Sequence, residues 1–202
     1  MKLYYAPGAC SLSPHIVARE AGIDLQLEKV DTKSHTYGAG ADFYKVNPKG
    51  YVPALEIKAG DILTEGPAIV QYLGDQKPQS GVVPAAGTTE RYRLQEMLGF
   101  INSEIHKTYS PLFNPNTKPE QAEERKEYLK KRYAYVEGLL TNREYLVGNK
   151  FTAADAYLFT VTNWAQYVKL DLTGFPNLLA FQKRVAARPA VQQAMKEEGL
   201  IK

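Results

Sequence analysis

The stretch that decides the fold is Lys2-Leu3-Tyr4-Tyr5-Ala6-Pro7-Gly8-Ala9-Cys10-Ser11-Leu12-Ser13-Pro14. Its first four residues are mostly apolar or aromatic, which is typical of a short strand. Pro7 and Gly8 predict a turn after that strand. Ser11 to Pro14 predict the start of a helix with proline in its first turn, and Gly22 predicts its end. The sequence therefore opens with a β-turn-α unit.

The residues that follow continue this alternation of strand and helix. Residues 25–30 alternate apolar and polar side chains with a period of two, which predicts a half-buried strand. Residues 31–42 are a polar connection. The further predicted elements are a helical turn over 42–46, a hairpin of strands 54–57 and 62–63, and a helix over 68–73. This order predicts a compact α/β domain over residues 1–77.

A linker and a second domain are predicted next. Residues 78–87 include two prolines and two glycines, a composition that is typical of a linker. Residues 88–202 predict only helices and therefore an all-helical domain, with helices over 88–106, 119–140, 153–168, 177–187 and 189–198. On the first of these helices, small and polar groups share one face, namely Gly99, Asn102, Ser103 and His106.

Composition and charge exclude several classes of protein. The 202 residues include 25 Lys and Arg against 22 Asp and Glu, a net charge of +3 that is too weak to indicate nucleic-acid binding but mildly favours a small anionic ligand. Cys10 is the only cysteine, which excludes an internal disulfide and a multi-cysteine zinc site. The uncharged stretch 3–18 is interrupted by prolines and glycine and contains His15, so it suits neither a signal peptide nor a membrane span. We expect a cytoplasmic protein that binds neither nucleic acid nor membrane.

Cys10 is the first candidate for chemistry, because it follows a strand and lies at the start of a helix. Unpaired backbone N–H groups and the helix dipole stabilise a thiolate at such a position. Thioredoxin-like folds place their active thiol at this turn of a βαβ unit. The alternative interpretation is a small buried apolar residue. Ser13 stands three residues further on, so a disulfide made by Cys10 must involve a small thiol or another protein.

Two further segments suit a peptide-like ligand. Pro53 enters the strand that begins at Ala54 and suggests a cis peptide bond, which would turn the backbone of Val52 outward to pair with an extended peptide. Glu65 and Gly66 precede a helix, where backbone N–H groups suit a carboxylate and the side chain of Glu65 suits an ammonium. Together they favour an amino-acid head group. The alternatives are a proline that ends an edge strand and a simple helix cap.

His106 and Lys107 follow on the polar face of the first long helix. They would bring positive charge near Cys10 if that helix crosses the α/β domain, and His106 also suits a hydrogen-bond donor or base near neutral pH. The alternative is a solvated surface pair. His15 lies inside the first helix and is predicted to be a structural histidine.

Four aromatic residues of the helical domain are predicted to lie in the core: Tyr109, Phe113, Tyr157 and Trp164. Phe113 and Trp164 are the better candidates to line an apolar pocket. Thr152 and Asp155 predict a capping box at the start of the helix over 153–168.

Taken together, these segments resemble a glutathione S-transferase, and specifically the bacterial beta class, over the whole chain. The resemblance is carried by residues 1–5, Pro7 to His15, Asn47 to Gly50 with Val52-Pro53, Leu63 to Gly66 with Ala68-Ile69, Ser103 to Lys107, and Phe151 to Leu158. It implies an α/β thioredoxin-like N-terminal domain that holds glutathione and an all-α helical-bundle C-terminal domain that supplies the acceptor pocket. It also implies a homodimer and a transferase that uses glutathione as co-substrate, without a metal.

The resemblance also implies a set of site residues. Cys10 and His106 are the expected catalytic residues. The expected glutathione site comprises Cys10, His35, Tyr51, Val52, Pro53, Glu65, Gly66, Asn102, Ser103, Glu104, His106 and Lys107, with Ser103 and Glu104 reaching the glutathione of the neighbouring subunit. The expected acceptor pocket comprises Tyr5, Ala9, Phe113 and Trp164.

Two positions depart from the family pattern, since His35 stands where the family often has lysine and Gly99 where it often has asparagine. Asn102, on the same helix face as Gly99, is the expected replacement for the lost amide.

The resemblance leaves three functions open besides conjugation. Cys10 would support thioltransferase chemistry if it forms a mixed disulfide with glutathione. A pathway-specific glutathione-dependent dehalogenase would use the same site. A non-catalytic binding protein would keep only the fold.

Overall fold

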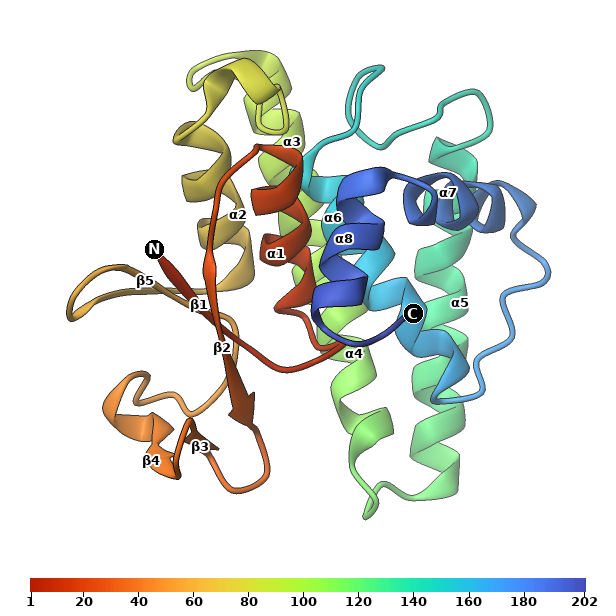
Figure 1. Cartoon of the computed structure of the whole chain (residues 1–202). Coiled ribbons are helices and arrows are strands. Elements are labelled where there is room, and N and C mark those ends of the chain that lie inside the picture. Colours follow the sequence, from red (N-terminus) through yellow and green to blue (C-terminus); the bar gives the residue numbers. More distant parts are fainter.

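The computed structural model describes residues 1–202 and combines a mixed β-sheet with a helical bundle (Figure 1). The sheet has the order β4-β3-β2-β1-β5-β6, in which β1 and β2 are parallel and the other neighbours are antiparallel. Its strands are β1 (Lys2–Tyr5), β2 (Gln26–Asp31), β3 (Thr36–Tyr37), β4 (Ala41–Asp42), β5 (Ala54–Lys58) and β6 (Asp61–Thr64).

Helices account for the rest of the regular structure. In the first part of the chain these are α1 (Leu12–Glu20), α2 (Gly66–Asp75) and two 3₁₀ turns, η1 (Phe43–Lys45) and η2 (Pro78–Ser80). The remainder consists of α3 (Thr89–Phe100), η3 (Ile101–His106), α4 (Lys107–Tyr109), η4 (Ser110–Phe113), α5 (Pro119–Leu139), α6 (Ala153–Thr162), η5 (Asn163–Gln166), α7 (Pro176–Ala186) and α8 (Pro189–Glu197). No helix is both long and apolar enough to cross a membrane.

The apolar side chains of β1 place this strand at the centre of the sheet. Leu3 pairs with Leu27 on one side and with Leu55 on the other, and both Leu3 and Leu55 are fully buried. The strands, the hairpin and the helices predicted from the sequence are all present. The exceptions are β3 and β4, which lie in the stretch predicted to be a polar connection. They are two residues long and form only because β3 pairs with the end of β2, a tertiary effect that local alternation cannot predict.

Helix α1 connects the two parts of the chain. It packs against α2 on one side and against α6 and α8 on the other, and Figure 1 shows it between the strands and the C-terminal helices. One continuous hydrophobic core therefore includes Leu12 and Ile16 of α1 together with Leu158 of α6. The predicted capping box of Thr152 and Asp155 is present at the start of α6. Helix α6 is buried on all sides but ends at Thr162, earlier than predicted.

Two sets of polar side-chain contacts fix the parts relative to one another. Arg91 of α3 donates to both carboxylate oxygens of Asp75 at the end of α2, at 2.8 and 2.6 Å, and also to the carbonyl of Pro84. His15 of α1 is fully buried, with one ring nitrogen 2.7 Å from Glu197 and the other 3.0 Å from Glu198. The prediction that His15 is a structural histidine is therefore confirmed.

The helix predicted over 88–106 is irregular in its second half. Residues 101–106 adopt a π-helix instead of continuing α3. The wider π turn changes which side chains share a face, and π segments are frequent at functional sites. This segment carries Asn102 and His106.

Candidate active site

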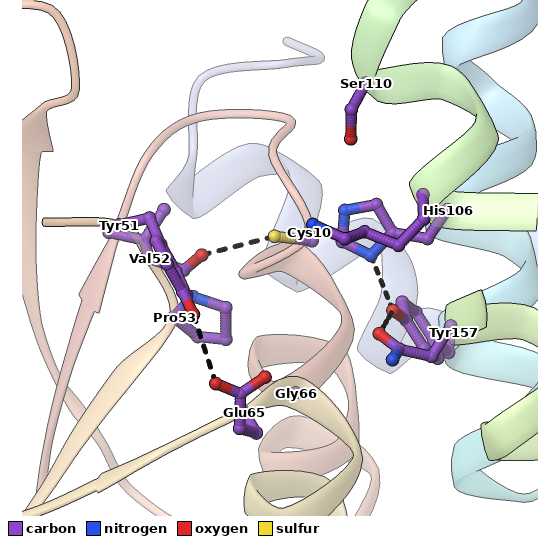
Figure 2. Close-up of a pocket in the computed structure, with 11 residues that line it drawn as sticks. Cys10, Tyr51, Val52, Pro53, Glu65, Gly66, His106, Ser110 and Tyr157 are labelled. Atoms are coloured by element: carbon purple, nitrogen blue, oxygen red, sulfur yellow. Dashed lines mark hydrogen bonds between the residues drawn. The ribbon is translucent and has the colours of Figure 1, made fainter. Parts of the chain in front are cut away.

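A cleft of about 270 Å³ lies where the loops at one end of the sheet face the π segment. Its lining residues are Cys10, Tyr51, Val52, Pro53, Glu65, Gly66, Asn102, His106, Lys107, Ser110 and Tyr157. Figure 2 shows Cys10, Val52 and Glu65 on one side of the cleft and His106 and Tyr157 on the other. The structure thus brings most of the expected glutathione-site residues together. Ser110 and Tyr157 were not predicted to belong to the site.

Cys10 lies just before α1, and its thiol faces the cleft. The thiol donates a hydrogen bond to the backbone carbonyl of Val52 at 3.3 Å. Burial raises the pKa of the Cys10 thiol to about 12, although the backbone N–H groups of Cys10 and Ser11 act in the opposite direction. Of the two interpretations of Cys10, the raised pKa favours a neutral, largely desolvated thiol in the unliganded chain, because desolvation outweighs the effect of the helix start.

Val52 presents its backbone from the loop before β5. The peptide bond between Val52 and Pro53 is cis, as the sequence suggested. Asn47 fixes this loop, since its side-chain amide donates to the carbonyl of Tyr51 at 2.7 Å. Gly50 has a φ of +74°, a backbone conformation that favours glycine, and a Cβ there would also displace the ring of Tyr44.

Glu65 lies at the start of α2, next to Gly66. It has a φ of +71°, a rare conformation for a residue with a side chain. Its carboxylate accepts from Lys49 at 2.5 Å and from the hydroxyl of Tyr51 at 3.2 Å. The hydrogen bond from Lys49 lowers the pKa of Glu65, so Glu65 is a carboxylate at neutral pH. An anionic side chain and helix N–H groups are therefore exposed side by side in the cleft.

His106 faces the cleft from the π segment. Its Nδ1 lies 2.6 Å from the hydroxyl of Tyr157, and its ring makes an edge contact with Trp164 at 4.9 Å between centroids. Burial lowers the pKa of His106 to about 4, with a smaller contribution from Lys107. His106 is therefore neutral at pH 7, and the expectation that it supplies positive charge near Cys10 is wrong. The neutral imidazole still has a lone pair that can accept a proton, although the lowered pKa makes it a weaker base. Lys107 lines the cleft as a cation.

Tyr157 was predicted to be a core residue, and it is only 3% exposed. Its hydroxyl nevertheless reaches the cleft and bonds to both His106 and Asn102. The sequence contains a signal for this role, because a buried tyrosine hydroxyl requires a polar partner and the stripe of Asn102 and His106 supplies one.

A second cavity of about 460 Å³ adjoins the cleft and shares Cys10, His106 and Ser110 with it. Its other lining residues are mainly apolar and include Ala9, Phe113, Trp164, Tyr167 and Leu200. The indole N–H of Trp164 donates to the carbonyl of Gly8 at 2.8 Å, which fixes one wall. Tyr5 does not line this cavity. Its side chain is buried in the core near His15, because β1 points it toward α1, so its assignment to an acceptor pocket is wrong.

Three expected glutathione-site residues lie outside the cleft of the single chain. His35 contacts the loop that carries Val52, because its Nδ1 lies 2.7 Å from the backbone carbonyl oxygen of Gly50. Ser103 donates to the carbonyl of Gly99, and Glu104 accepts from the hydroxyl of Tyr128 on α5. The structure brings no cluster of three or more His, Cys, Asp or Glu side chains together as metal ligands.

Comparisons with known proteins show which proteins this chain is similar to. The family model for the "Glutathione S-transferase, N-terminal domain" matches residues 8–76, and the model for the "Glutathione S-transferase, C-terminal domain" matches residues 100–189. The chain is 46% identical to glutathione S-transferase GstA of Escherichia coli O157:H7 over 200 residues, which cover 99% of this chain and all of GstA.

Two solved structures extend the comparison. A bacterial beta class glutathione S-transferase of Sphingomonas chungbukensis superposes with a TM-score of 0.96 at 43% identity, with full coverage of both chains. A sphingomonad glutathione S-transferase complexed with glutathione has a TM-score of 0.95 at 46% identity, also with full coverage of both chains.

Proposed function

We propose, from the premise that this chain belongs to the glutathione S-transferase family, that it binds glutathione in the cleft between Cys10, Val52 and Glu65. The chain is a glutathione transferase. The observation that carries the proposed site is the junction of the two cavities. The polar cleft and the apolar cavity meet at Cys10 and His106, so that a thiol held in the first faces an acceptor held in the second.

The cleft matches glutathione group by group. The carboxylate of Glu65 suits the ammonium of the γ-glutamyl group, and the N–H of Gly66 at the start of α2 suits its carboxylate. The backbone of Val52 suits the cysteinyl peptide, which would pair with it as an added strand does. This orientation directs the sulfur of glutathione toward Cys10 and His106.

The charges in the cleft favour glutathione as a thiolate. Lys107 supplies the cation, and the backbone N–H groups of Cys10 and Ser11 add partial positive charge at the start of α1. Cys10 itself is a neutral thiol that can donate a hydrogen bond to the thiolate. The thiolate attacks an electrophilic carbon of an apolar acceptor, the new C–S bond forms, and the leaving group departs with its electron pair.

Each part of the chain has its own proposed role. Residues 1–77 are proposed to hold glutathione, residues 78–87 to link the domains, and residues 88–202 to supply most of the acceptor pocket.

A homodimer is proposed through the face shared by α3 and α5. Helix α3 exposes Tyr92 at 62% and α5 exposes Tyr135 at 50%, and Phe100 of α3 is in edge contact with Tyr135. Such aromatic exposure is typical of an interface. A second copy there would bring Ser103 and Glu104, on the adjoining π segment, toward the partner's cleft. Sedimentation velocity of the wild type and of Tyr135→Glu tests this proposal, with a dimer expected for the wild type only.

Isothermal titration with reduced glutathione, followed by a conjugation assay with a chlorodinitrobenzene, tests the proposed site. Binding by the wild type and weak binding by Glu65→Gln are expected, and equal affinity of both would overturn it. Lys58→Gln, a substitution in the hairpin away from the cleft, is the matched control.

The redox alternative has its own test, the intact mass of the wild type and of Cys10→Ala after incubation with oxidised glutathione. Because burial keeps Cys10 protonated, we expect slow formation of a mixed disulfide in the wild type and none in the variant. Retained conjugation by Cys10→Ala would make Cys10 a redox residue and only an aid in conjugation.

A further inference from the structure

Tyr157 forms a hydrogen-bonded link between two polar side chains of the π segment. Its hydroxyl donates to Oδ1 of Asn102 at 2.9 Å and lies 2.6 Å from Nδ1 of His106. In Figure 2 a dashed line joins the ring of His106 to the hydroxyl of Tyr157.

The tautomer of His106 follows from the single proton on the hydroxyl of Tyr157. A tyrosine hydroxyl carries one proton, and here that proton is given to Asn102. The hydroxyl is therefore an acceptor toward His106, and Nδ1 of His106 must carry the donated hydrogen. Because neutral imidazole carries a single N–H, its other nitrogen, Nε2, has a free lone pair.

The surroundings hold the ring in this state. The π segment places Asn102 and His106 on the same side of the chain, toward Tyr157. The ring of Trp164 packs on His106, and Trp164 is itself anchored to the carbonyl of Gly8. The ring of Tyr157 meets His106 edge-on at 5.7 Å between centroids. Three contacts thus fix the orientation of the ring, and His106 lines both cavities where they meet.

We propose that Tyr157 is a positioning residue that holds His106 in the Nδ1–H tautomer, so that Nε2 accepts the proton of the substrate thiol. This rests on the proposed function of the cleft. In the step, the S–H bond of glutathione breaks and its electron pair stays on sulfur, while the proton forms a new N–H bond at Nε2. The resulting imidazolium still donates from Nδ1 to Tyr157. After the thiolate has attacked the acceptor, the proton leaves Nε2 for the leaving group or for water.

The variant Tyr157→Phe tests the proposal, because it removes the hydroxyl and keeps the ring. We expect kcat/KM for conjugation to fall by about 10-fold to 100-fold, which is less than the roughly 100-fold to 10,000-fold that proton transfer by a positioned side chain contributes, because the base itself remains in place. The KM for glutathione should change by less than about 2-fold, because Tyr157 acts through the base and not through binding. Tyr133→Phe is the matched control, since Tyr133 also has a buried hydroxyl, bonded to Tyr109 and not to His106.

Two readouts separate positioning from a merely structural role. Nitrogen-15 NMR of the imidazole should show a proton on Nδ1 and none on Nε2 of His106 in the wild type, and a mixture of tautomers in Tyr157→Phe. In a His106→Gln background, adding Tyr157→Phe should produce no further loss of activity, because the residue through which Tyr157 acts is gone. If Tyr157→Phe lowers activity in the His106→Gln background by the same factor as in the wild type, the proposal is overturned.

The outcomes also distinguish the proposal from the function it rests on. A wild type with active conjugation and the Nε2–H tautomer would overturn the role of Tyr157 alone. A wild type with the Nδ1–H tautomer that binds glutathione but conjugates nothing would overturn the base role of His106 together with the proposed function.

Discussion

Replacing Glu198 by alanine is expected to destabilise the fold and to disturb the acceptor cavity. Glu198 directly follows α8, and its carboxylate is fully buried. One oxygen accepts from the backbone N–H of Gly8 at 2.9 Å, and the other lies 3.0 Å from Nδ1 of the buried His15. The C-terminal helix thereby holds the loop that precedes Cys10.

The size of the effect follows from what the substitution leaves behind. Removing the carboxylate leaves two buried groups without a hydrogen-bond partner, the N–H of Gly8 and Nδ1 of His15, at a cost of about 3 to 5 kcal/mol for the two together. In a chain of this length, each kcal/mol lowers the melting temperature by roughly 2 to 4 °C. We therefore expect Glu198→Ala to melt roughly 6 to 20 °C below the wild type.

Scanning calorimetry at pH 7 measures this shift, and Glu197→Ala is the matched control. Glu197 lies on the same helix and contacts His15 and Arg19, but its side chain is 29% exposed. Solvent screens its ion pairs, so a loss of about 1 kcal/mol or less is expected. Gly8 lines the acceptor cavity, so Glu198→Ala should also raise the KM for the acceptor more than the KM for glutathione. A melting temperature within about 3 °C of the wild type, or a shift no larger than that of Glu197→Ala, would refute the reasoning.

Three further expectations concern other parts of the chain. Because His106 has a pKa of about 4 and acts as a base only when neutral, kcat/KM should fall as the pH drops below about 4, and an acidic limb near 6.5 would contradict this. Glu65→Gln should weaken glutathione binding, measured by titration calorimetry, about 10-fold to 100-fold, since a hydrogen bond to a charged group is worth about 1.5 to 3 kcal/mol. Lys49→Ala should not weaken binding, because Lys49 competes with glutathione for the carboxylate of Glu65. Gly74→Ala should destabilise the fold by about 1 to 3 kcal/mol in denaturant titrations, because its Cβ would overlap Val83, and an unchanged midpoint would show that the linker can move aside.

The sequence predicted the elements whose pattern is local. The strand-turn-helix opening, the hairpin and the long helices each combine a clear period with a turn or cap, and all of them are present. The cis peptide bond before Pro53 and the capping box at Thr152 were predictable for the same reason, because a few neighbouring residues determine them. Strands β3 and β4 were not predictable, since they exist only through pairing with β2.

The residues of the cleft were predictable as a set, but their charges were not. A helix start next to Cys10 favours a thiolate, and a histidine next to Lys107 suggests a cation. Both expectations assume that water reaches the groups. Burial reverses both, raising the pKa of Cys10 and lowering that of His106, and the depth of a side chain depends on elements far away in the sequence. Tyr157 lies in the core as predicted, but the role of its hydroxyl was not predicted, because its polar partners Asn102 and His106 come from another helix.

Because Cys10 and His106 are both neutral in the unliganded chain, other groups must stabilise the thiolate of glutathione. With His106 and Cys10 neutral, and Glu65 engaged by Lys49, the positive charge that remains in the cleft belongs to Lys107 and to the N–H groups at the start of α1. A thiolate formed by proton transfer to His106 therefore faces a cation on one side and a new imidazolium on the other. The base becomes charged only when the thiol loses its proton, so its attraction for the sulfur strengthens at that step and not in the ground state. Interactions of this kind accelerate a reaction, whereas a permanently charged histidine would only have tightened binding of the anion.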